Sequence, residues 1–356
     1  MDELLYRCGC PAPLPTGQET APPAQDHTAI DLHCHLVTPQ VAKLIAGRPE
    51  IATLQEQMWR VVGERSMRAT IAMESDVAVL SANVDLRLRE MDRFGIAIQV
   101  LSPAPGQYHY WADEALAATL CDVQNAHIAD VCARWPDRFL AFGAIALQHP
   151  EAAIRQMRAC MAAGFKGVEI SSNIAGRDLS DPAFAEFWST AAELGAVVFI
   201  HPLGSTLGDR LDTHYLSNVI GQPLETTIAL SKLIVAGLWD RLPGIKVLAA
   251  HGGGYLPNYA GRLDHAYQVR PEARTCSLRP SDYLGRLWYD TVVHSPDVLA
   301  SLIARVGIDR IVVGSDFPYD MGEYRLESLL DGIPGLDVRG RDRILRENAR
   351  SLLGLD

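Results

Sequence analysis

Four short apolar segments of this sequence each reach a histidine or an aspartate that could bind a metal ion. They are AIDLHCH at 29–35, AVVFIHP with His201, KVLAAHGGG with His251, and RIVVGSDFP with Asp316. Each is rich in alanine or β-branched residues and bounded by turn residues, which is typical of a parallel strand buried on both faces. In a closed parallel barrel the carboxyl ends of the strands converge on one mouth. The sequence therefore predicts that these side chains share one active site.

Candidate strands and helical segments alternate along most of the chain. One helix is predicted to begin with Ser295 as N-cap and Pro296 and to stop at Gly307, and another is expected between Asp181 and Gly195. Eight strand and helix pairs predict a (β/α)8 barrel in residues 29–356. An open doubly wound sheet is the alternative, but no Gly-rich phosphate loop follows the first strand. The predicted strands are 29–35, 98–103, 139–147, 167–172, two ending at His201 and His251, 287–293 and 310–316.

Two segments do not belong to this repeat. Residues 1–28 are rich in proline and lack periodicity, which predicts an irregular arm, and its CGC motif at 8–10 is too isolated to predict a metal or redox site. Residues 39–92 are too many for one crossover helix. We expect them to form a helical cap that contributes substrate contacts and excludes water, with barrel plugging or a dimer contact as the simpler role.

The composition narrows the classes of partner. A net charge of −11 disfavours nucleic acid and anionic membranes, both of which require clustered Lys and Arg, so a small molecule is the expected partner. The sequence contains neither a run of about 18 uncharged apolar residues nor the pattern of a secretory signal. Seven scattered cysteines predict free thiols in a reducing compartment. Together these features predict a cytoplasmic protein.

The strand ends supply a plausible set of metal ligands. His33 and His35 are two residues apart on a strand, so both point to one face with α-carbons roughly 6.6 Å apart, and Cys34 points to the other face. His201 would add a third nitrogen and Asp316 a carboxylate, which ligates or assists proton transfer. Such a set suits one divalent ion, Zn most of all, with Mn or Fe accommodated. His251, followed by three glycines, is predicted as general acid/base, with a fourth histidine ligand as the alternative.

Beyond single residues, the chain contains a series of longer motifs. They are DLHCH, LREMDRFGIAIQVLS, WPDRFLAFGAI, FIHP, PLETTIA, AHGGGYLPNYAGRLDH, WYDTVVHS and VVGSDFPYDMGE. In these motifs the chain resembles the amidohydrolase superfamily, specifically the branch of aminocarboxymuconate-semialdehyde decarboxylase. The resemblance covers nearly the whole chain after the arm, and it implies the same ligands, His251 as catalytic residue, one Zn or Mn ion and a homodimer. Ile170 to Ser172 replace the modified lysine of binuclear members, which implies a mononuclear site.

The likeness also implies the reaction class and a carboxylate substrate. Arg262 matches an arginine that reaches the substrate carboxylate across the dimer interface in this branch, although a surface salt bridge is the simpler role. Ala78 stands near a second substrate arginine of the decarboxylase. Candidate substitutes are Arg65 or Arg68 in the cap and Arg210 after the fifth strand. Leu203 replaces a bulky Trp, which predicts a differently shaped pocket. His294 is a candidate for hydrogen bonding to substrate, or for a structural contact.

These features predict a metal-dependent, non-oxidative decarboxylase of an unsaturated or aromatic carboxylic acid. Because a metal ion and a histidine also serve other reactions, a hydratase or a hydrolase of an ester, lactone or amide is the alternative.

Overall fold

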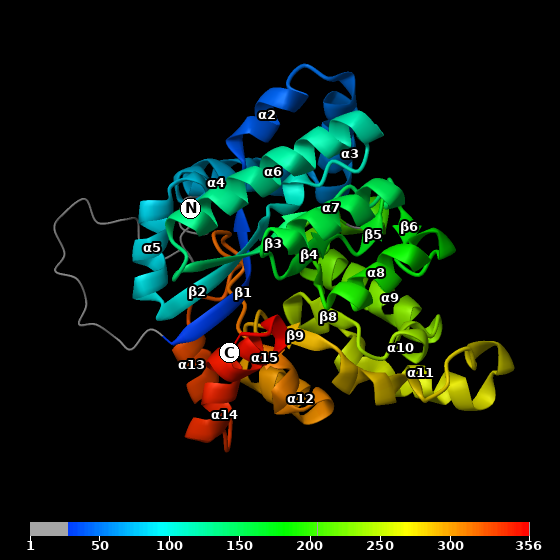
Figure 1. Ribbon diagram of the computed structural model, residues 1–356. Helices are drawn as coiled ribbons and strands as arrows, with labels where there is room; N and C mark the ends of the chain where they lie inside the picture. Colours follow the sequence, from blue (N-terminus) through cyan, green and yellow to red (C-terminus); the bar gives the residue numbers. More distant parts are fainter. Residues whose placement is uncertain (1–27, 205, 356) are drawn as a thin grey trace.

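The computed structural model describes residues 28–204 and 206–355, and the predicted arm, including its CGC motif, lies outside the described residues except for Thr28. Within them, eight parallel strands form one sheet in the order β1-β2-β3-β4-β7-β8-β9-β10. Val313 and Phe317, just after β10, make parallel bridges to Asp31 and Cys34 of β1, which closes the sheet. The predicted (β/α)8 barrel is confirmed (Figure 1). The strands are β1 (Ala29–Leu36), β2 (Ile96–Pro103), β3 (Phe139–Ala144), β4 (Gly167–Ile170), β7 (Val197–Ile200), β8 (Lys246–Ala249), β9 (Trp288–Asp290) and β10 (Ile311–Val312).

The last strand is shorter than the sequence predicts. The predicted strand 310–316 is reduced to β10, preceded by a 3-10 helix at Ile308–Arg310. Asp316 has a φ of 57°, so the chain turns there instead of continuing as a strand. The predicted strands 139–147 and 287–293 likewise stop at Ala144 and Asp290. In each case the residues after the hydrogen-bonded strand bend away at the mouth of the barrel.

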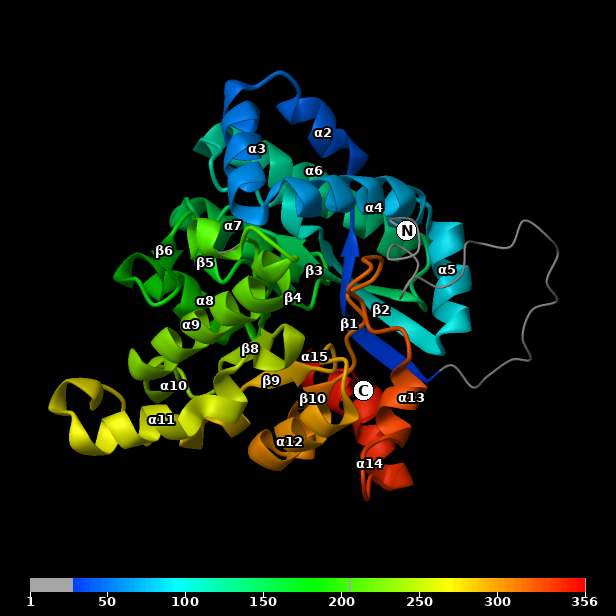
Figure 2. The same ribbon diagram turned by 180° about the vertical axis from the view of Figure 1, so that it is seen from behind.

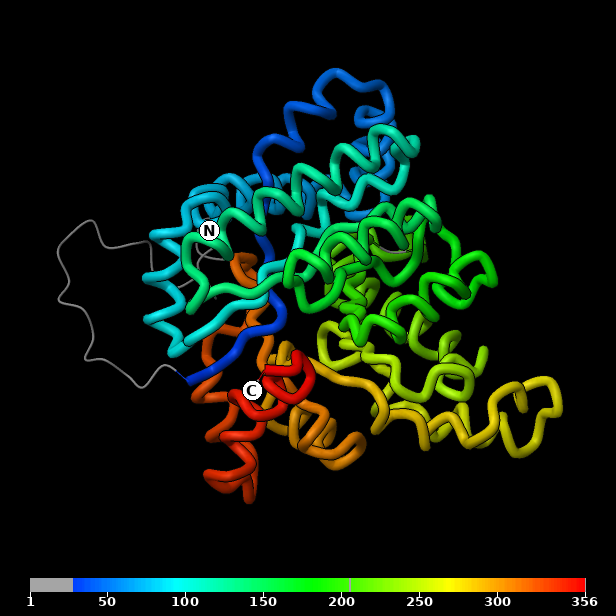
Figure 3. The backbone as a smooth tube through the Cα atoms, viewed as in Figure 1, coloured from blue at the N-terminus to red at the C-terminus, as the bar shows by residue number. Residues whose placement is uncertain are grey.

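Helices surround the barrel and follow the strands along the chain (Figure 3). Ser295 accepts a hydrogen bond from the backbone N–H of Val298 and starts α12, which ends before Gly307, as predicted. Asp181 also caps as predicted, but the first turn after it is a separate 3-10 helix at Pro182–Phe184. The surrounding helices are α6 (Glu114–Arg134), α7 (Pro150–Ala162), α8 (Ala185–Leu194), α9 (Gln222–Val235), α10 (Leu238–Arg241), α11 (Leu256–Val269), α12 (Pro296–Val306), α13 (Leu326–Asp331), α14 (Val338–Asp342) and α15 (Asn348–Leu353).

The insertion between β1 and β2 is helical and lies at the end of the barrel that β1 points to (Figure 2). At the junction of its second and third helices, Gly63 has a φ of 83°, and a Cβ there would lie 1.6 Å from the carbonyl oxygen of Asp212. Only glycine allows this close approach to the segment after β7. The insertion is therefore packed against a loop at the barrel mouth. Its helices are α2 (Pro39–Ile45), α3 (Pro49–Val62), α4 (Glu64–Ala82) and α5 (Val84–Arg93).

Two apolar layers hold the barrel together. Its interior is filled by side chains such as Leu32, Phe142 and Phe199, while a larger cluster packs the strands against the helices. Cys34 belongs to this outer cluster and its thiol donates to the carbonyl of Val100, as its alternation with the neighbouring histidines predicts. No helix in the described part of the chain has the length and apolar character needed to cross a membrane.

Candidate metal centre and active site

The predicted chemistry-bearing side chains meet at the carboxyl ends of four strands. His33 and His35 come from β1, and His201 directly follows β7. His251 lies two residues after β8, and Asp316 follows β10. The ring of His201 lies 4.9 Å from that of His33, 4.8 Å from that of His35 and 5.1 Å from that of His251, measured between centroids. One potential ligand atom each from His33, His201, His251 and Asp316 lies within 4.8 Å of the others. The structure thus brings all five residues into one cluster.

Asp316 connects the histidines of the cluster. Its Oδ1 lies 3.2 Å from Nε2 of His33 and 3.1 Å from Nε2 of His35, and its Oδ2 lies 3.7 Å from Nε2 of His251. Burial alone would raise the pKa of Asp316, but its interactions with His33, His251 and His35 hold that pKa well below its usual value. Asp316 therefore provides a negative charge at the centre of the cluster.

The buried nitrogens in this cluster fit a divalent cation. Among the described residues, neither ring nitrogen of His201 has a hydrogen-bond partner, and the same is true of Nδ1 of His251. Buried polar atoms normally have a hydrogen-bond partner or a ligand. Several unpartnered nitrogens beside a carboxylate therefore indicate a bound group that is not part of the protein. Imidazole nitrogens and a carboxylate oxygen are the ligand types of Zn and related ions.

Two buried acids that the sequence reasoning missed support this cluster. Asp290, at the end of β9, has Oδ2 2.6 Å from Nδ1 of His33. Glu169 of β4 accepts a hydrogen bond from the hydroxyl of Tyr108, and its Oε2 lies 3.8 Å from Nδ1 of His35. Each stands as a lone acid within a buried apolar strand, in the motifs WYD and GVEI. That pattern was the available signal, because an acid is fully buried in a strand only when it has partners.

The residues predicted to bind substrate are two exposed arginines and a histidine that contacts an acid outside the cluster. Arg262 is exposed on α11, and Arg210 is exposed in a 3-10 helix at Gly208–Leu211. His294 follows β9, and its Nδ1 lies 3.5 Å from Oε2 of Glu323, so the structural contact considered for it is present. None of the contacts described within this single chain links these three residues to the histidine cluster.

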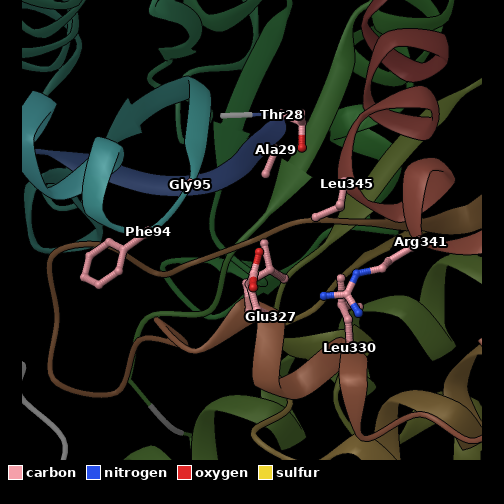
Figure 4. A pocket seen from close by; sticks show the side chains of 9 residues that line it. Thr28, Ala29, Phe94, Gly95, Glu327, Leu330, Arg341 and Leu345 are labelled. Atoms are coloured by element: carbon pink, nitrogen blue, oxygen red, sulfur yellow. The ribbon is translucent and has the colours of Figure 1, made fainter. Parts of the chain in front are cut away.

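A small pocket elsewhere in the barrel has a different character. It begins at the amino-terminal end of β1, beside Thr28 and Ala29 (Figure 4). His33 and His35 lie toward the opposite end of the same strand. Among its lining residues Glu327 is the one candidate metal ligand, so the pocket offers no comparable site. It is lined by Thr28, Ala29, Phe94, Gly95, Leu326, Glu327, Leu330, Arg341 and Leu345.

Comparison with known proteins gives the family. A family model described as Amidohydrolase matches residues 30–355. The chain belongs to the amidohydrolase family. It is 35% identical to the 2-amino-3-carboxymuconate-6-semialdehyde decarboxylase of Dictyostelium discoideum over 275 residues, which are 76% of this chain and 77% of that protein. It is 28% identical to the gamma-resorcylate decarboxylase of Rhizobium radiobacter, over 76% of this chain and 87% of that protein. The resemblance seen in the sequence motifs is thereby confirmed.

Solved structures show the same architecture. This amidohydrolase matches 2,6-dihydroxybenzoate decarboxylase in complex with 2,6-dihydroxybenzoate with a TM-score of 0.75 at 25% identity, over 92% of this chain and 99% of that one. It also matches the 5-carboxyvanillate decarboxylase of Novosphingobium aromaticivorans, whose structure contains manganese, with a TM-score of 0.80 at 22% identity over 92% of this chain and 96% of that one. At that lower identity the second likeness concerns the fold alone.

Proposed function

We propose that this amidohydrolase is a metal-dependent, non-oxidative decarboxylase of an aromatic or unsaturated carboxylic acid. The observation that carries the proposal is the convergence of three buried histidines and Asp316 beside a fourth, more open histidine, in a chain whose relatives are decarboxylases. Because relatives that act on muconate and resorcylate skeletons align over similar parts of the chain, both substrate classes remain within the proposal.

We assign the metal ligands to His33, His35, His201 and Asp316. Their donor types favour Zn, with Mn as the alternative, and manganese is the ion in the related 5-carboxyvanillate decarboxylase structure. A divalent ion held there would supply a fixed positive charge that orients an anionic substrate and polarises it. His251 shares the cluster geometry, so its place as acid/base instead of ligand rests on its exposure: its side chain is 17% exposed, whereas those of His33 and His35 are fully buried.

The protein's own residues divide the remaining work. His251, open to the mouth, donates a proton to the substrate carbon that bears the carboxylate. The bond between that carbon and the carboxylate then breaks, carbon dioxide leaves, and the new C–H bond keeps the proton. Asp316, with Oδ2 3.7 Å from Nε2 of His251, orients the ring. His251 regains its proton from solvent, which its partial exposure permits.

The proposal also includes the substrate-binding arginines, the oligomeric state and the cellular location. We propose a homodimer in which Arg262, exposed on α11, binds the substrate carboxylate of the partner's site, with Arg210 and His294 as additional contacts from the loops at the mouth. A cytoplasmic location agrees with the free thiols of Cys34, Cys121, Cys132, Cys160 and Cys276 in the described part of the chain.

The test uses purified protein loaded in turn with Zn and Mn. Substrates are 2,6-dihydroxybenzoate, related hydroxybenzoates and 2-amino-3-carboxymuconate-6-semialdehyde. The proposal expects carbon dioxide release, with one deuterium from D2O at the carbon that lost the carboxylate and no 18O from labelled water in the other product. Incorporation of 18O without carbon dioxide release would instead establish a hydratase or hydrolase. A His251→Asn variant carried through the same assay controls for contaminating activity.

A further inference from the structure

A completely buried arginine lies directly behind the proposed metal centre. Arg87 belongs to α5, a helix that packs on the outside of β2 (Figure 1). None of the surface of Arg87 is exposed. Its Nη2 donates a hydrogen bond to the backbone carbonyl of His35, and its Nη1 donates to Oε1 of Gln99 at 3.0 Å. The guanidinium also lies over the ring of Phe317, 4.7 Å from its centroid. Arg87 therefore contacts the backbone of one proposed ligand, His35 on β1, and the residue that follows another, Asp316.

The side-chain amide of Gln99 connects Arg87 to the carboxylate of Asp31. The Nε2 group of Gln99 donates to Oδ2 of Asp31 at 2.9 Å, so the amide accepts from Arg87 at one end and donates to Asp31 at the other. Asp31 is also fully buried. A buried cation and a buried anion are thus paired through one neutral side chain, which compensates charges that would otherwise be costly in the interior.

Asp31 in turn holds the segments that carry the ligands. Its Oδ1 accepts the backbone N–H of His33 at 3.1 Å and that of Ser315 at 3.0 Å, and its Oδ2 accepts the hydroxyl of Ser315 at 2.5 Å. Ser315 immediately precedes Asp316. The backbone N–H groups of Ser315 and Asp316 also donate to the carbonyl of His33, at 3.1 and 2.7 Å. The Asp31 carboxylate therefore adds side-chain hydrogen bonds to a direct backbone link between His33 and Asp316.

The seam between β1 and residues 311–317 has little regular strand pairing, although backbone N–H groups of Leu32 and His35 donate to the carbonyls of Val313 and Phe317. Strand β10 has two residues, and beyond it β1 meets the chain at two isolated bridges, Asp31 with Val313 and Cys34 with Phe317. We infer that Arg87, Gln99 and Asp31 form a positioning network that sets the spacing of His33, His35 and Asp316 for metal binding. The inference rests on the proposed metal-dependent function. Outer-shell partners of this kind alter metal affinity by about 10- to 100-fold when they are removed.

A matched control exists at the other end of the barrel. Arg138 donates to the carbonyl of Ala97 at 2.8 Å and to that of Ile96 at 3.2 Å, and it binds Asp92 at 2.7 Å. Arg138 binds backbone carbonyls at the beginning of β2, as Arg87 binds a backbone carbonyl near the end of β1. Arg138 is at the end of the barrel opposite the cluster. Arg138→Met therefore reports what the loss of a backbone-clamping arginine does to stability alone.

The first experiment compares Arg87→Met with Arg138→Met in the full-length protein. The dissociation constants for Zn and Mn are measured by competition with a chelator, and thermal unfolding is followed in the metal-free state. The network predicts an affinity about 10- to 100-fold weaker in Arg87→Met and within about threefold of wild type in Arg138→Met, while both variants lower the unfolding temperature. Equal affinities in the two variants would overturn the inference. Wild-type protein that binds no ion would instead refute the proposed metal site.

A second set of variants leaves Arg87 in place and decides the question if Arg87→Met fails to fold. Asp31→Asn removes the negative charge of the network. Gln99→Glu places a second carboxylate next to that of Asp31, and the two repel each other. In the double variant, the new glutamate accepts from Arg87 and from the new asparagine amide, whose oxygen still accepts the N–H groups of His33 and Ser315. The network predicts a metal affinity for the double variant closer to wild type than for either single variant. Additive weakening would contradict it.

Discussion

One oxygen of Asp290 serves both His33 and His251. Its Oδ2 lies 2.6 Å from Nδ1 of His33 and accepts the backbone N–H of His251 at 2.9 Å, while Oδ1 accepts the N–H of Gly252 at 2.9 Å. Burial alone would raise the pKa of Asp290, but the hydrogen bond and charge of His33 lower it, so the group stays ionised. A proposed ligand and the proposed acid/base are therefore aligned by a single buried carboxylate.

Replacing this carboxylate tests the alignment. In Asp290→Asn, an amide N–H group or a less basic oxygen faces both Nδ1 of His33 and the N–H of His251. We expect metal affinity to weaken about 10- to 100-fold and kcat to fall further at saturating metal, because His251 also shifts. Chelator competition and steady-state kinetics at high metal concentration separate the two effects. An unchanged metal affinity would show that His33 needs no such partner.

Substitution of His251 separates acid/base catalysis from metal ligation. We expect His251→Asn to keep its metal content, because His33, His35, His201 and Asp316 remain, and to lose about 10²- to 10⁴-fold in kcat. His201→Asn is the matched comparison, since that ring is buried with both nitrogens unpartnered among the described residues, and it should lose the ion. Elemental analysis of both variants gives the answer. Equal metal loss in the two would make His251 a ligand.

The sequence predicted which side chains meet at the mouth of the barrel better than it predicted where the strands end. His33, His201, His251 and Asp316 meet because buried parallel strands end at one mouth, and an apolar run followed by a polar residue is visible in the sequence. The early end of β10 was not predictable in this way. Its apolar run continues to Val313, but the positive φ of Asp316 and the side-chain bonds of Asp31 at this seam depend on tertiary contacts.

The residues behind the cluster illustrate a second limit of sequence reasoning. Arg87 lies in a helix whose sequence VDLRLREMDR is mostly polar and charged, so it reads as a solvent-facing charge. Its burial follows from the packing of α5 against β2 and from partners at Gln99 and His35, far from it in the sequence. For Asp290, a lone acid inside a predicted strand, the sequence signals that a partner exists but does not show that the partner is His33. Side chains that reach across elements depend on the assembled barrel, which local pattern does not encode.

Removal of the metal ion should lower the stability of the folded chain. An ion that binds only the native state stabilises it by about 2.7 kcal/mol when its concentration is 100 times its Kd. We therefore expect treatment with a chelator to lower the unfolding temperature by several degrees, and added Zn or Mn to restore it. Differential scanning calorimetry with and without excess ion measures the shift. In Asp316→Asn, the unfolding temperature should change little when the ion is added or removed. A shift as large as that of wild type would mean that the ion binds elsewhere.

His109 gives a stability prediction that depends on pH. It has a φ of 47° between β2 and α6, its Nδ1 accepts a hydrogen bond from the indole N–H of Trp111 at 3.4 Å, and its buried Nε2 has no partner among the described residues. Burial lowers its pKa to about 4. Because an unfolded histidine has a pKa near 6.5, the unfolded chain binds more protons between these values. The stability contributed by neutral His109 is therefore complete above pH 6.5 and is lost as the pH falls toward 4.

The size of this loss is at most about 3 kcal/mol, since each unit of pKa shift corresponds to about 1.36 kcal/mol. His109→Asn removes the titration and keeps a residue type that tolerates a positive φ. We expect the free energy of unfolding of the variant, measured in urea, to fall less steeply than that of wild type between pH 6.5 and 4. Other titrating groups act on both proteins equally, so the difference between the two curves isolates His109. Parallel curves over this range would mean that His109 accepts a proton in the folded state without cost.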